Sequence, residues 1–159
     1  MVLAISCHPR DTRDPNEVAE SVRIFGIISN ACDDAPDICA DTTSDGYPTP
    51  TYICRLPNKA FDAHVRSLLT GLKYDHNIEF KDVALNRSQL NDLFKKVQAR
   101  LPELESHGVL NNPSDPPTID GCRSQVIVYA PEPWPADLPD LLHQMFGPHV
   151  VPAPPMKRL

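Results

Sequence analysis

Glycine is scarce in this sequence, with only six residues in a chain of 159. Glycine-rich loops let backbone amides approach the phosphates of a nucleotide, and neither a Walker pattern nor a dinucleotide-binding pattern occurs here. Long apolar runs are missing too, because none approaches the ~20 residues that a membrane-spanning helix requires. The sequence therefore argues against a nucleotide-dependent enzyme and predicts no membrane span.

An excess of basic residues is also missing: 15 Lys and Arg stand against 21 Asp and Glu, a net charge of −6. The imbalance is confined to residues 1–50, which hold 3 basic and 9 acidic side chains, whereas residues 51–159 hold 12 of each. Binding to nucleic acid needs clustered Lys and Arg that neutralise phosphates. The distribution therefore argues against a nucleic-acid partner.

Proline is abundant, with 18 residues, and 11 of them follow Asn112. A hydrophobic content of 41% argues against a disordered chain. The length fits one domain. We therefore predict a single domain over residues 1–159, made of an acidic N-terminal region (1–50), a charge-balanced α/β core (51–152) and a tail (153–159).

The acidic N-terminal region begins with a predicted helix. Asp14 is suited to cap this helix and Pro15 to occupy its first position. Gly26 is expected to end the helix or to mark the change to a short strand. Residues 30–50 show no periodicity and contain no Lys or Arg, so we predict that they form an acidic loop.

From residue 51 onward, strand and helix patterns alternate. Strands are predicted at 51–56, 77–84, 125–129 and 149–151. Helices are predicted at 61–72, from a Ser88 cap to Gly108, and at 136–146, with Pro102 causing a kink or an end near Arg100. This order predicts an α/β (or α+β) fold, a two-layer sandwich in which helices cover one small, roughly four-stranded sheet.

Five cysteines are present, and none forms a Cys-x-x-Cys pair. Cys32 and Cys39 flank a short polar segment, which makes them candidates for one disulfide. Cys54 and Cys122 lie in or beside predicted strands, so they would be neighbours in one sheet and candidates for a second. The alternative is five reduced thiols, with Cys7 left over in either case.

The cysteines and the N-terminal residues bear on the cellular compartment of the protein. Residues 3–7 resemble the end of a lipoprotein signal, but no basic segment precedes them. Either the chain is cytoplasmic, or a leader has been removed from an exported protein. An odd cysteine and paired loop cysteines favour export.

The acidic loop is the first candidate site. Three interpretations are open: a solvated loop, a docking surface for a basic protein partner, or a Ca²⁺ site. The segment Asp41–Gly46 partly matches the start of an EF-hand loop, but Tyr52 stands where the bidentate Glu belongs. The residues concerned are Asp33, Asp34, Asp37, Asp41 and Asp45.

Catalysis by a thiol is a further alternative. Cys54 with His64 or His143, or the adjacent Cys7 and His8, would form the Cys–His pair of a small hydrolase. No signature of a known cysteine hydrolase surrounds any of these cysteines. The histidines also show no i,i+4 pair of the kind that holds zinc; they include His64, His76, His107, His143 and His149. We therefore predict no catalytic residue, no metal site and no cofactor.

Trp134, the sole tryptophan, stands within the segment Pro131–Pro135. A tryptophan in a stiff, proline-rich loop is suited to anchor a protein partner, because tryptophan is enriched at binding hot spots. It is equally suited to cap a hydrophobic core.

The chain from residue 51 to residue 152 resembles a known group of proteins. Four segments carry the resemblance: residues 88–93, 105–109, 126–129 and 145–151. They are similar to small actinobacterial exported proteins whose βαβ modules are similar to the pro-regions of alpha-lytic-type serine proteases. The resemblance implies a module that binds, folds or restrains a partner. The Asp-rich N-terminal third and the proline-rich segment 111–118 depart from that pattern.

Taken together, these features predict a non-catalytic protein-binding or regulatory module. Its contact surfaces would be the acidic loop, the Trp134 segment, or both. The alternatives are a small Cys/His-dependent hydrolase and a Ca²⁺-stabilised exported domain.

Overall fold

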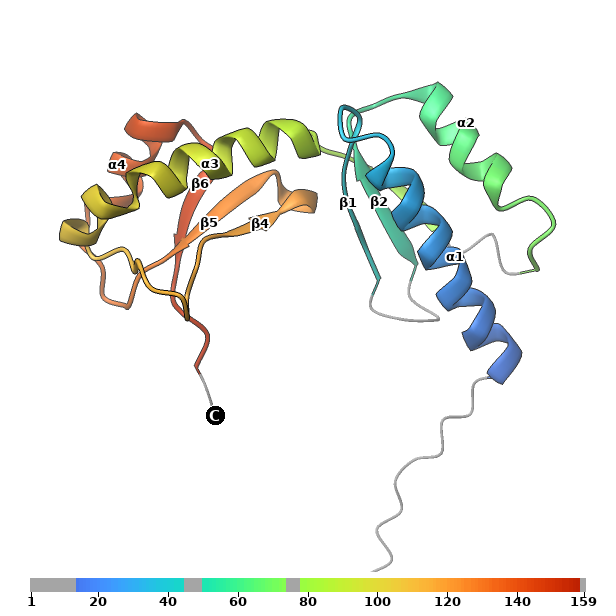
Figure 1. Cartoon of the computed structure of the whole chain (residues 1–159), viewed down its shortest axis with the longest axis horizontal. Helices are drawn as coiled ribbons and strands as arrows, with labels where there is room; N and C mark the ends of the chain where they lie inside the picture. Colours follow the sequence, from blue (N-terminus) through green and yellow to red (C-terminus); the bar gives the residue numbers. More distant parts are fainter. Residues whose placement is uncertain (1–13, 45–49, 74–77, 158–159) are drawn as a thin grey trace, which may run out of the picture.

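The computed structural model of the chain describes residues 14–44, 50–73 and 78–157 (Figure 1). In chain order, the elements are α1 (Pro15–Asp33), β1 (Cys39–Thr43), β2 (Thr51–Arg55), α2 (Lys59–Leu68), β3 (Ile78–Asp82), α3 (Arg87–Leu104), the 3₁₀ turn η1 (Glu105–His107), β4 (Thr118–Asp120), the 3₁₀ turn η2 (Gly121–Arg123), β5 (Gln125–Tyr129), α4 (Leu138–Phe146) and β6 (Val150–Ala153). The predicted mixed α/β class is confirmed.

The strands form two three-stranded sheets, not the single roughly four-stranded sheet that the alternation predicted. In the first sheet, β1 is antiparallel to β2 and β2 is parallel to β3. The second sheet repeats this plan, with β4 antiparallel to β5 and β5 parallel to β6. The chain is therefore an αββαβ unit built twice, and we call residues 14–82 the first module and residues 87–153 the second module.

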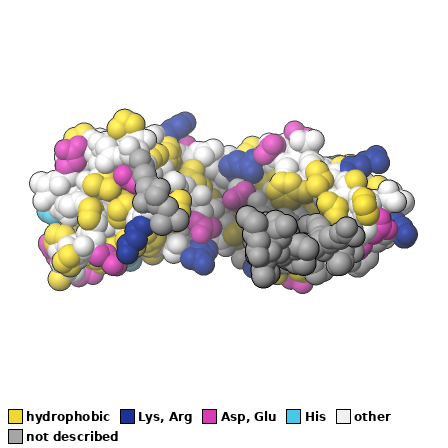
Figure 2. Space-filling view, turned by 90° about the horizontal axis from the view of Figure 1, so that it is seen from below, with side chains coloured by type: hydrophobic (Ala, Val, Ile, Leu, Met, Phe, Trp, Pro, Cys, Tyr) yellow, Lys and Arg dark blue, Asp and Glu magenta, His cyan; other side chains and the backbone are white. Residues whose placement is uncertain are grey.

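Each module has its own hydrophobic core, formed between its sheet and its two helices. In the first, the fully buried Ile28 of α1, Ile53 of β2 and Val65 of α2 meet. In the second, Val97 of α3 and Leu142 of α4 pack on the sheet. Figure 1 shows the helices of each module on one side of its sheet. From below, the two modules are two lobes with a narrower section between them (Figure 2).

The predicted start of the first helix is confirmed, but its predicted end at Gly26 is wrong. Asp14 caps α1 by accepting a hydrogen bond from the backbone N–H of Asn16 at 2.9 Å. The helix then passes through Gly26 and continues to Asp33. A glycine inside a helix costs only about 1 kcal/mol. Burial of Ile28 and Cys32 on the following turns outweighs that cost.

The predicted acidic loop at residues 30–50 is also wrong for much of its length. The last turn of α1 occupies its first residues, and β1 occupies Cys39–Thr43. Because β1 pairs with β2, the expected division at residue 50 falls between two paired strands. Both α1 and β1 are thus integral parts of the first module.

The helix α3 begins earlier than predicted and continues past Pro102. Its cap is Asn86 rather than Ser88: the Asn86 side chain accepts a hydrogen bond from the Gln89 N–H, and the Gln89 side chain accepts one from the Asn86 N–H. Of the two predicted effects of Pro102, an end near Arg100 is wrong, because α3 continues to Leu104; Gly108, the predicted stop, caps the η1 turn that follows. The exposed proline is tolerated because Leu104, beyond it, is fully buried in the second core.

The connection after α3 contains β4, a strand that the proline-rich sequence did not predict. In the described ranges, no helix combines the length and the apolar character that crossing a membrane would require.

Candidate functional site

Four of the five predicted aspartates lie in the described structure, close to one another in the first module. Asp33 is the last residue of α1, and Asp34 is its C-cap. Asp37 is exposed in the turn that follows, and Asp41 is half-buried in β1. Asp45 lies outside the described residues. We call Asp33, Asp34 and Asp37 the acidic end of α1.

The acidic end of α1 carries more negative charge than its carboxylates alone supply. The carbonyl groups at the C-terminus of a helix are equivalent to about half a negative charge. No basic residue stands in the last turn of α1 to offset it. Aspartates at this end make the electrostatic potential still more negative. Glu17, in the first turn of the same helix, lies at the positive end of the helix dipole and is therefore favourable.

Arg87, in the first turn of α3, is the basic side chain that reaches this acidic end. Its guanidinium forms an ion pair with Asp33, donates to the carbonyl oxygen of Ala40 at 3.2 Å and lies 3.4 Å from Sγ of Cys32. Asp33 nevertheless keeps 62% of its side chain exposed. Arg87 of the second module thus holds the acidic end of α1 in place and leaves its carboxylates exposed to solvent.

The start of α3 also holds the turn at residues 34–38. The side-chain amide of Asn86 donates to the carbonyl oxygen of Asp37 at 2.8 Å. The backbone N–H of Ser88 donates to the carbonyl oxygen of Pro36 at 3.0 Å. The turn beside the acidic end of α1 is therefore held by the start of α3, while the carboxylates of this end stay exposed to solvent.

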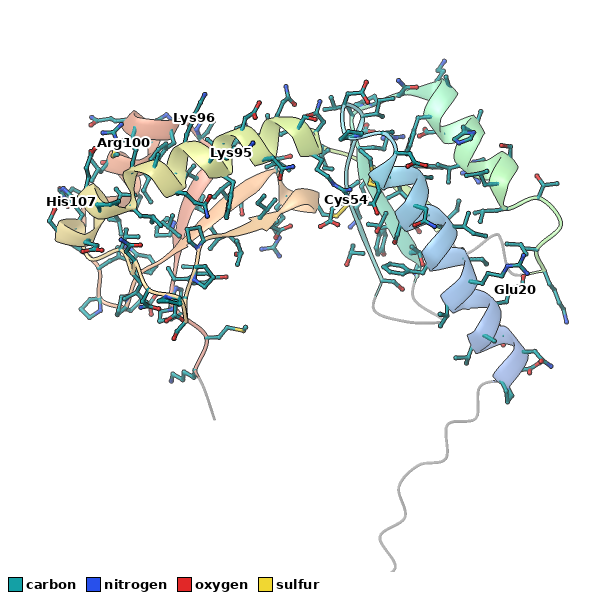
Figure 3. All side chains as sticks on the ribbon, viewed as in Figure 1. Glu20, Cys54, Lys95, Lys96, Arg100 and His107 are labelled. Atoms are coloured by element: carbon teal, nitrogen blue, oxygen red, sulfur yellow. A yellow bond between two sulfur atoms is a disulfide. The ribbon has the colours of Figure 1, made fainter. Side chains whose placement is uncertain are left out.

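Both candidate disulfides are present. Cys32–Cys39 joins the end of α1 to β1 within the first module. Cys54–Cys122 joins β2 to η2. The expectation that Cys54 and Cys122 are neighbours in one sheet is wrong, because this disulfide connects the two modules. Figure 3 shows Cys54 where the two halves of the molecule meet.

The disulfides also bear on the alternative of a Cys/His hydrolase. A thiolate is the nucleophile in such chemistry. In residues 14–44, 50–73 and 78–157, every cysteine is bonded to another, so Cys54 has no thiol to offer to His64 or His143. The adjacent Cys7 and His8 lie outside the described residues, as does His76.

The sequence did not single out two small residues of the second module that complete the junction. Ser124, with φ of 54°, accepts hydrogen bonds through Oγ from the backbone N–H groups of Ala84, at 3.0 Å, and Leu85, at 3.3 Å. A Cβ atom on Gly121 would lie 2.6 Å from Cβ of Asp41. Only glycine lets η2 approach β1 this closely.

Replacing Gly121 with alanine is expected to lower the free energy of unfolding by about 1–3 kcal/mol, because the new methyl group forces η2 away from β1. Gly26 is the control, since a Cβ there would meet nothing within 4 Å. Thermal or urea unfolding measures both variants. If G121A is as stable as G26A, the close approach of η2 to β1 does not hold the junction.

A second cluster that the sequence did not reveal surrounds Arg55, whose side chain is only 8% exposed. Its guanidinium donates two hydrogen bonds of 2.7 Å to the carboxylate of Asp62 and one of 2.5 Å to Asp82. The hydrogen bond to Asp62 is the largest cause of a raised pKa at Arg55. Arg55 and Arg66 also lie over the ring of Phe80, each 5.2 Å from its centroid. Because Asp62 and Asp82 both pair with the Arg55 guanidinium, this cluster stabilises the first module.

Trp134 lies between the second hydrophobic core and solvent. Its indole is half-buried and packs against the second core. It also lines a shallow, open surface hollow of about 440 Å³ together with Glu132 and Pro133. The same side chain therefore supports the module and offers an aromatic surface to solvent.

Among residues 14–44, 50–73 and 78–157, no group of three or more His, Cys, Asp or Glu side chains is arranged to hold a metal ion. In the segment proposed for Ca²⁺, Asp41 lies in β1, where its carboxylate accepts a hydrogen bond from the N–H of Thr42 at 2.8 Å. Asp45 and Gly46 lie outside the described residues.

Comparisons with family models, with curated proteins and with solved structures found no match to this chain.

Proposed function

We propose that the chain is an exported, non-catalytic protein-binding module that docks a basic partner protein on the acidic end of α1. One observation carries the proposal: Asp34 stands at the negative end of α1 with the exposed Asp37 close by in sequence, and neither belongs to the ion pair that Arg87 forms with Asp33. A surface that keeps carboxylates in this position gains from a cationic partner, which relieves their repulsion with the helix carbonyls.

The electrostatics suit an encounter with a positively charged surface. Asp34 and Asp37 are exposed and have no ion-pair partner among the residues that the structure describes. The basic side chains Lys95, Lys96 and Arg100 lie along α3, apart from the junction (Figure 3). Charges arranged in this way steer association and make its rate depend on salt.

The rigidity of the surface supports the same function. The Cys32–Cys39 disulfide, Arg87 and Asn86 fix the turn at residues 34–38, so little ordering entropy is lost on binding. Two disulfides are typical of proteins in an oxidising compartment, which favours export over the cytoplasm. The resemblance to pro-region modules also implies a partner-binding role.

Neutralising Asp34 and Asp37 as asparagines is expected to weaken binding to a lysine-rich peptide about threefold to tenfold at low ionic strength, because each exposed charge contributes modestly. Biolayer interferometry with a labelled deca-lysine peptide measures the change at several salt concentrations. The difference should disappear at high salt.

The control removes the same total charge from neither proposed surface, at the exposed Glu79 of β3 and Asp92 of α3. If E79Q/D92N weakens peptide binding as much as D34N/D37N does, the peptide responds to net charge alone and the acidic end of α1 is not the docking surface. A pull-down of the native partner at low and high salt, with the same two double variants, extends the test to a natural protein.

A further inference from the structure

The hollow beside Trp134 has a definite chemical character. Its lining consists of an indole, a proline ring and a carboxylate, from Trp134, Pro133 and Glu132. Prolines at 131 and 135 flank the segment and are exposed. Because proline fixes its own backbone and restricts the residue before it, the loop presents the indole with little conformational freedom to lose.

These groups suit an extended, proline-rich segment that carries a positive charge. Proline-rich peptides adopt the polyproline II conformation and dock their rings on aromatic side chains. Glu132 supplies an exposed carboxylate at the rim. Asp137 and Asp140, also exposed, follow in the chain, and no Lys or Arg occurs between residues 131 and 156. The matching ligand therefore has a basic residue beside its prolines.

The chain itself contains such a segment directly after β6, at Pro154–Lys157, which reads Pro-Pro-Met-Lys. Beyond β6, Pro154 and Lys157 are exposed, and Met156 is 85% exposed. Neither Lys157 nor Glu132 forms an ion pair with any other described residue. The segment and the hollow thus present unpaired charges of opposite sign.

The segment does not fill the hollow of its own molecule. None of its residues lines the hollow. The two begin at the same end of the sheet, because β5 and β6 are parallel and the Ala130 N–H donates to the carbonyl oxygen of Ala153 at 2.9 Å. From there, the segment continues away from the sheet (Figure 1). Two consecutive prolines, Pro154 and Pro155, oppose the reversal that docking within one molecule would need.

We propose that the Trp134 hollow binds the proline-rich segment 154–157, which follows β6, of a second copy of this chain. Pro154 and Pro155 would stack on the indole of Trp134, and Lys157 would face Glu132. When each molecule gives its segment to the other, the contact closes with two-fold symmetry and forms a dimer. This proposal does not depend on the acidic end of α1.

The sole tryptophan makes the contact directly measurable, because all indole fluorescence comes from Trp134. As the concentration of the full chain rises, we expect its emission to shift to shorter wavelength while sedimentation shows a growing fraction of dimer. A synthetic peptide of residues 151–158 should cause the same shift at low protein concentration and dissociate the dimer. Replacing Pro154 and Pro155 with serine should weaken dimerisation about tenfold.

A charge exchange identifies the two surfaces. The single variants K157E and E132K should each weaken dimerisation about threefold to tenfold, and the double variant E132K/K157E should restore it. All these positions are exposed, so the fold does not depend on them. The matched control is K95E, a charge reversal on the exposed side of α3.

Three results would overturn the proposal. The first is a chain that remains monomeric at every concentration, even if the peptide binds it. The second is dimerisation that the proline and charge variants leave unchanged. The third is failure of the double charge exchange to restore what the single changes remove. Each is independent of deca-lysine binding, which reports on the acidic end of α1.

Discussion

Replacing both Cys54 and Cys122 with alanine is expected to lower the free energy of unfolding by about 4 kcal/mol. The disulfide spans 68 residues of sequence. In the chain-entropy model, opening a loop of this length restores that much freedom to the unfolded chain. The loss is a large share of the 5–15 kcal/mol that is typical for domains. Urea unfolding of the oxidised wild type and of C54A/C122A measures the difference.

The same change is expected to separate the unfolding of the two modules. Each has its own core, and Cys54–Cys122 is the covalent bond that joins them apart from the main chain. We expect C54A/C122A to unfold in two steps, seen by calorimetry and by Trp134 fluorescence, which reports on the second module. Coincident transitions for both probes would show that the polar contacts at the junction suffice to couple the modules.

The control is the shorter disulfide. Cys32–Cys39 spans only 7 residues, so its loss is expected to cost about 2.5 kcal/mol in the same model, within the first module. The test is which of the two double variants, C54A/C122A or C32A/C39A, loses more unfolding free energy. If C32A/C39A destabilises the chain more than C54A/C122A, packing of the buried sulfurs outweighs the constraint on the unfolded chain.

Replacing Arg55 with methionine is expected to lower the free energy of unfolding by about 3 kcal/mol, because removal of one member of a buried ion pair leaves the other unpaired. The side chain of Asp62 is only 24% exposed and would lose both of its 2.7 Å hydrogen bonds to Arg55. Asp82, which is 73% exposed, would recover water at little cost.

Two further variants sharpen the test. The double variant R55M/D62L should regain most of the lost stability, because an apolar pair of similar size replaces a buried ion pair without leaving a charge behind. R100M breaks the solvent-exposed pair between Arg100 and Glu103 and should leave the free energy of unfolding nearly unchanged, because water screens that pair. An R55M chain as stable as R100M would show that the Arg55 cluster contributes nothing to the first module.

Local signals in the sequence predicted elements well where the residues themselves determine the backbone. Asp14 and Pro15 predicted the start of α1, and the β-branched run at residues 125–129 predicted β5. The predicted helix ends were wrong where the burial of later residues determines whether the helix continues. Gly26 and Pro102 are poor helix residues, but both helices continue because the residues that follow them are packed in a core.

The repeat of the αββαβ unit could not be predicted from residue similarity. In register, Thr51 of β2 pairs with Ile78, and the equivalent Val126 of β5 pairs with Val150. Four residues further along, the first module has the buried, ion-paired Arg55, whereas the second has the fully buried Ala130. Equivalent positions thus carry opposite chemistry, although the backbone plan is the same.

The candidate site was predictable in part. Spacing and strand context identified both disulfides, and composition identified the aspartates at the end of α1. Arg87 and Ser124 were not identified, because their roles rest on partners far away in sequence: Arg87 reaches Asp33, and Ser124 bonds the N–H of Ala84. A single sequence contains no local signal for such contacts.

The modular plan also sets an order of events during synthesis. Every strand pairing lies within one module, so the first module can complete its sheet before the second has been made. Cys32 and Cys39 are then both present, whereas Cys54 must wait as a free thiol until Cys122 emerges. Early closure of Cys32–Cys39 removes two of the three cysteines that precede Cys54 in the chain, so that only Cys7 remains as an earlier competitor for Cys122. The short disulfide therefore favours correct formation of the long one.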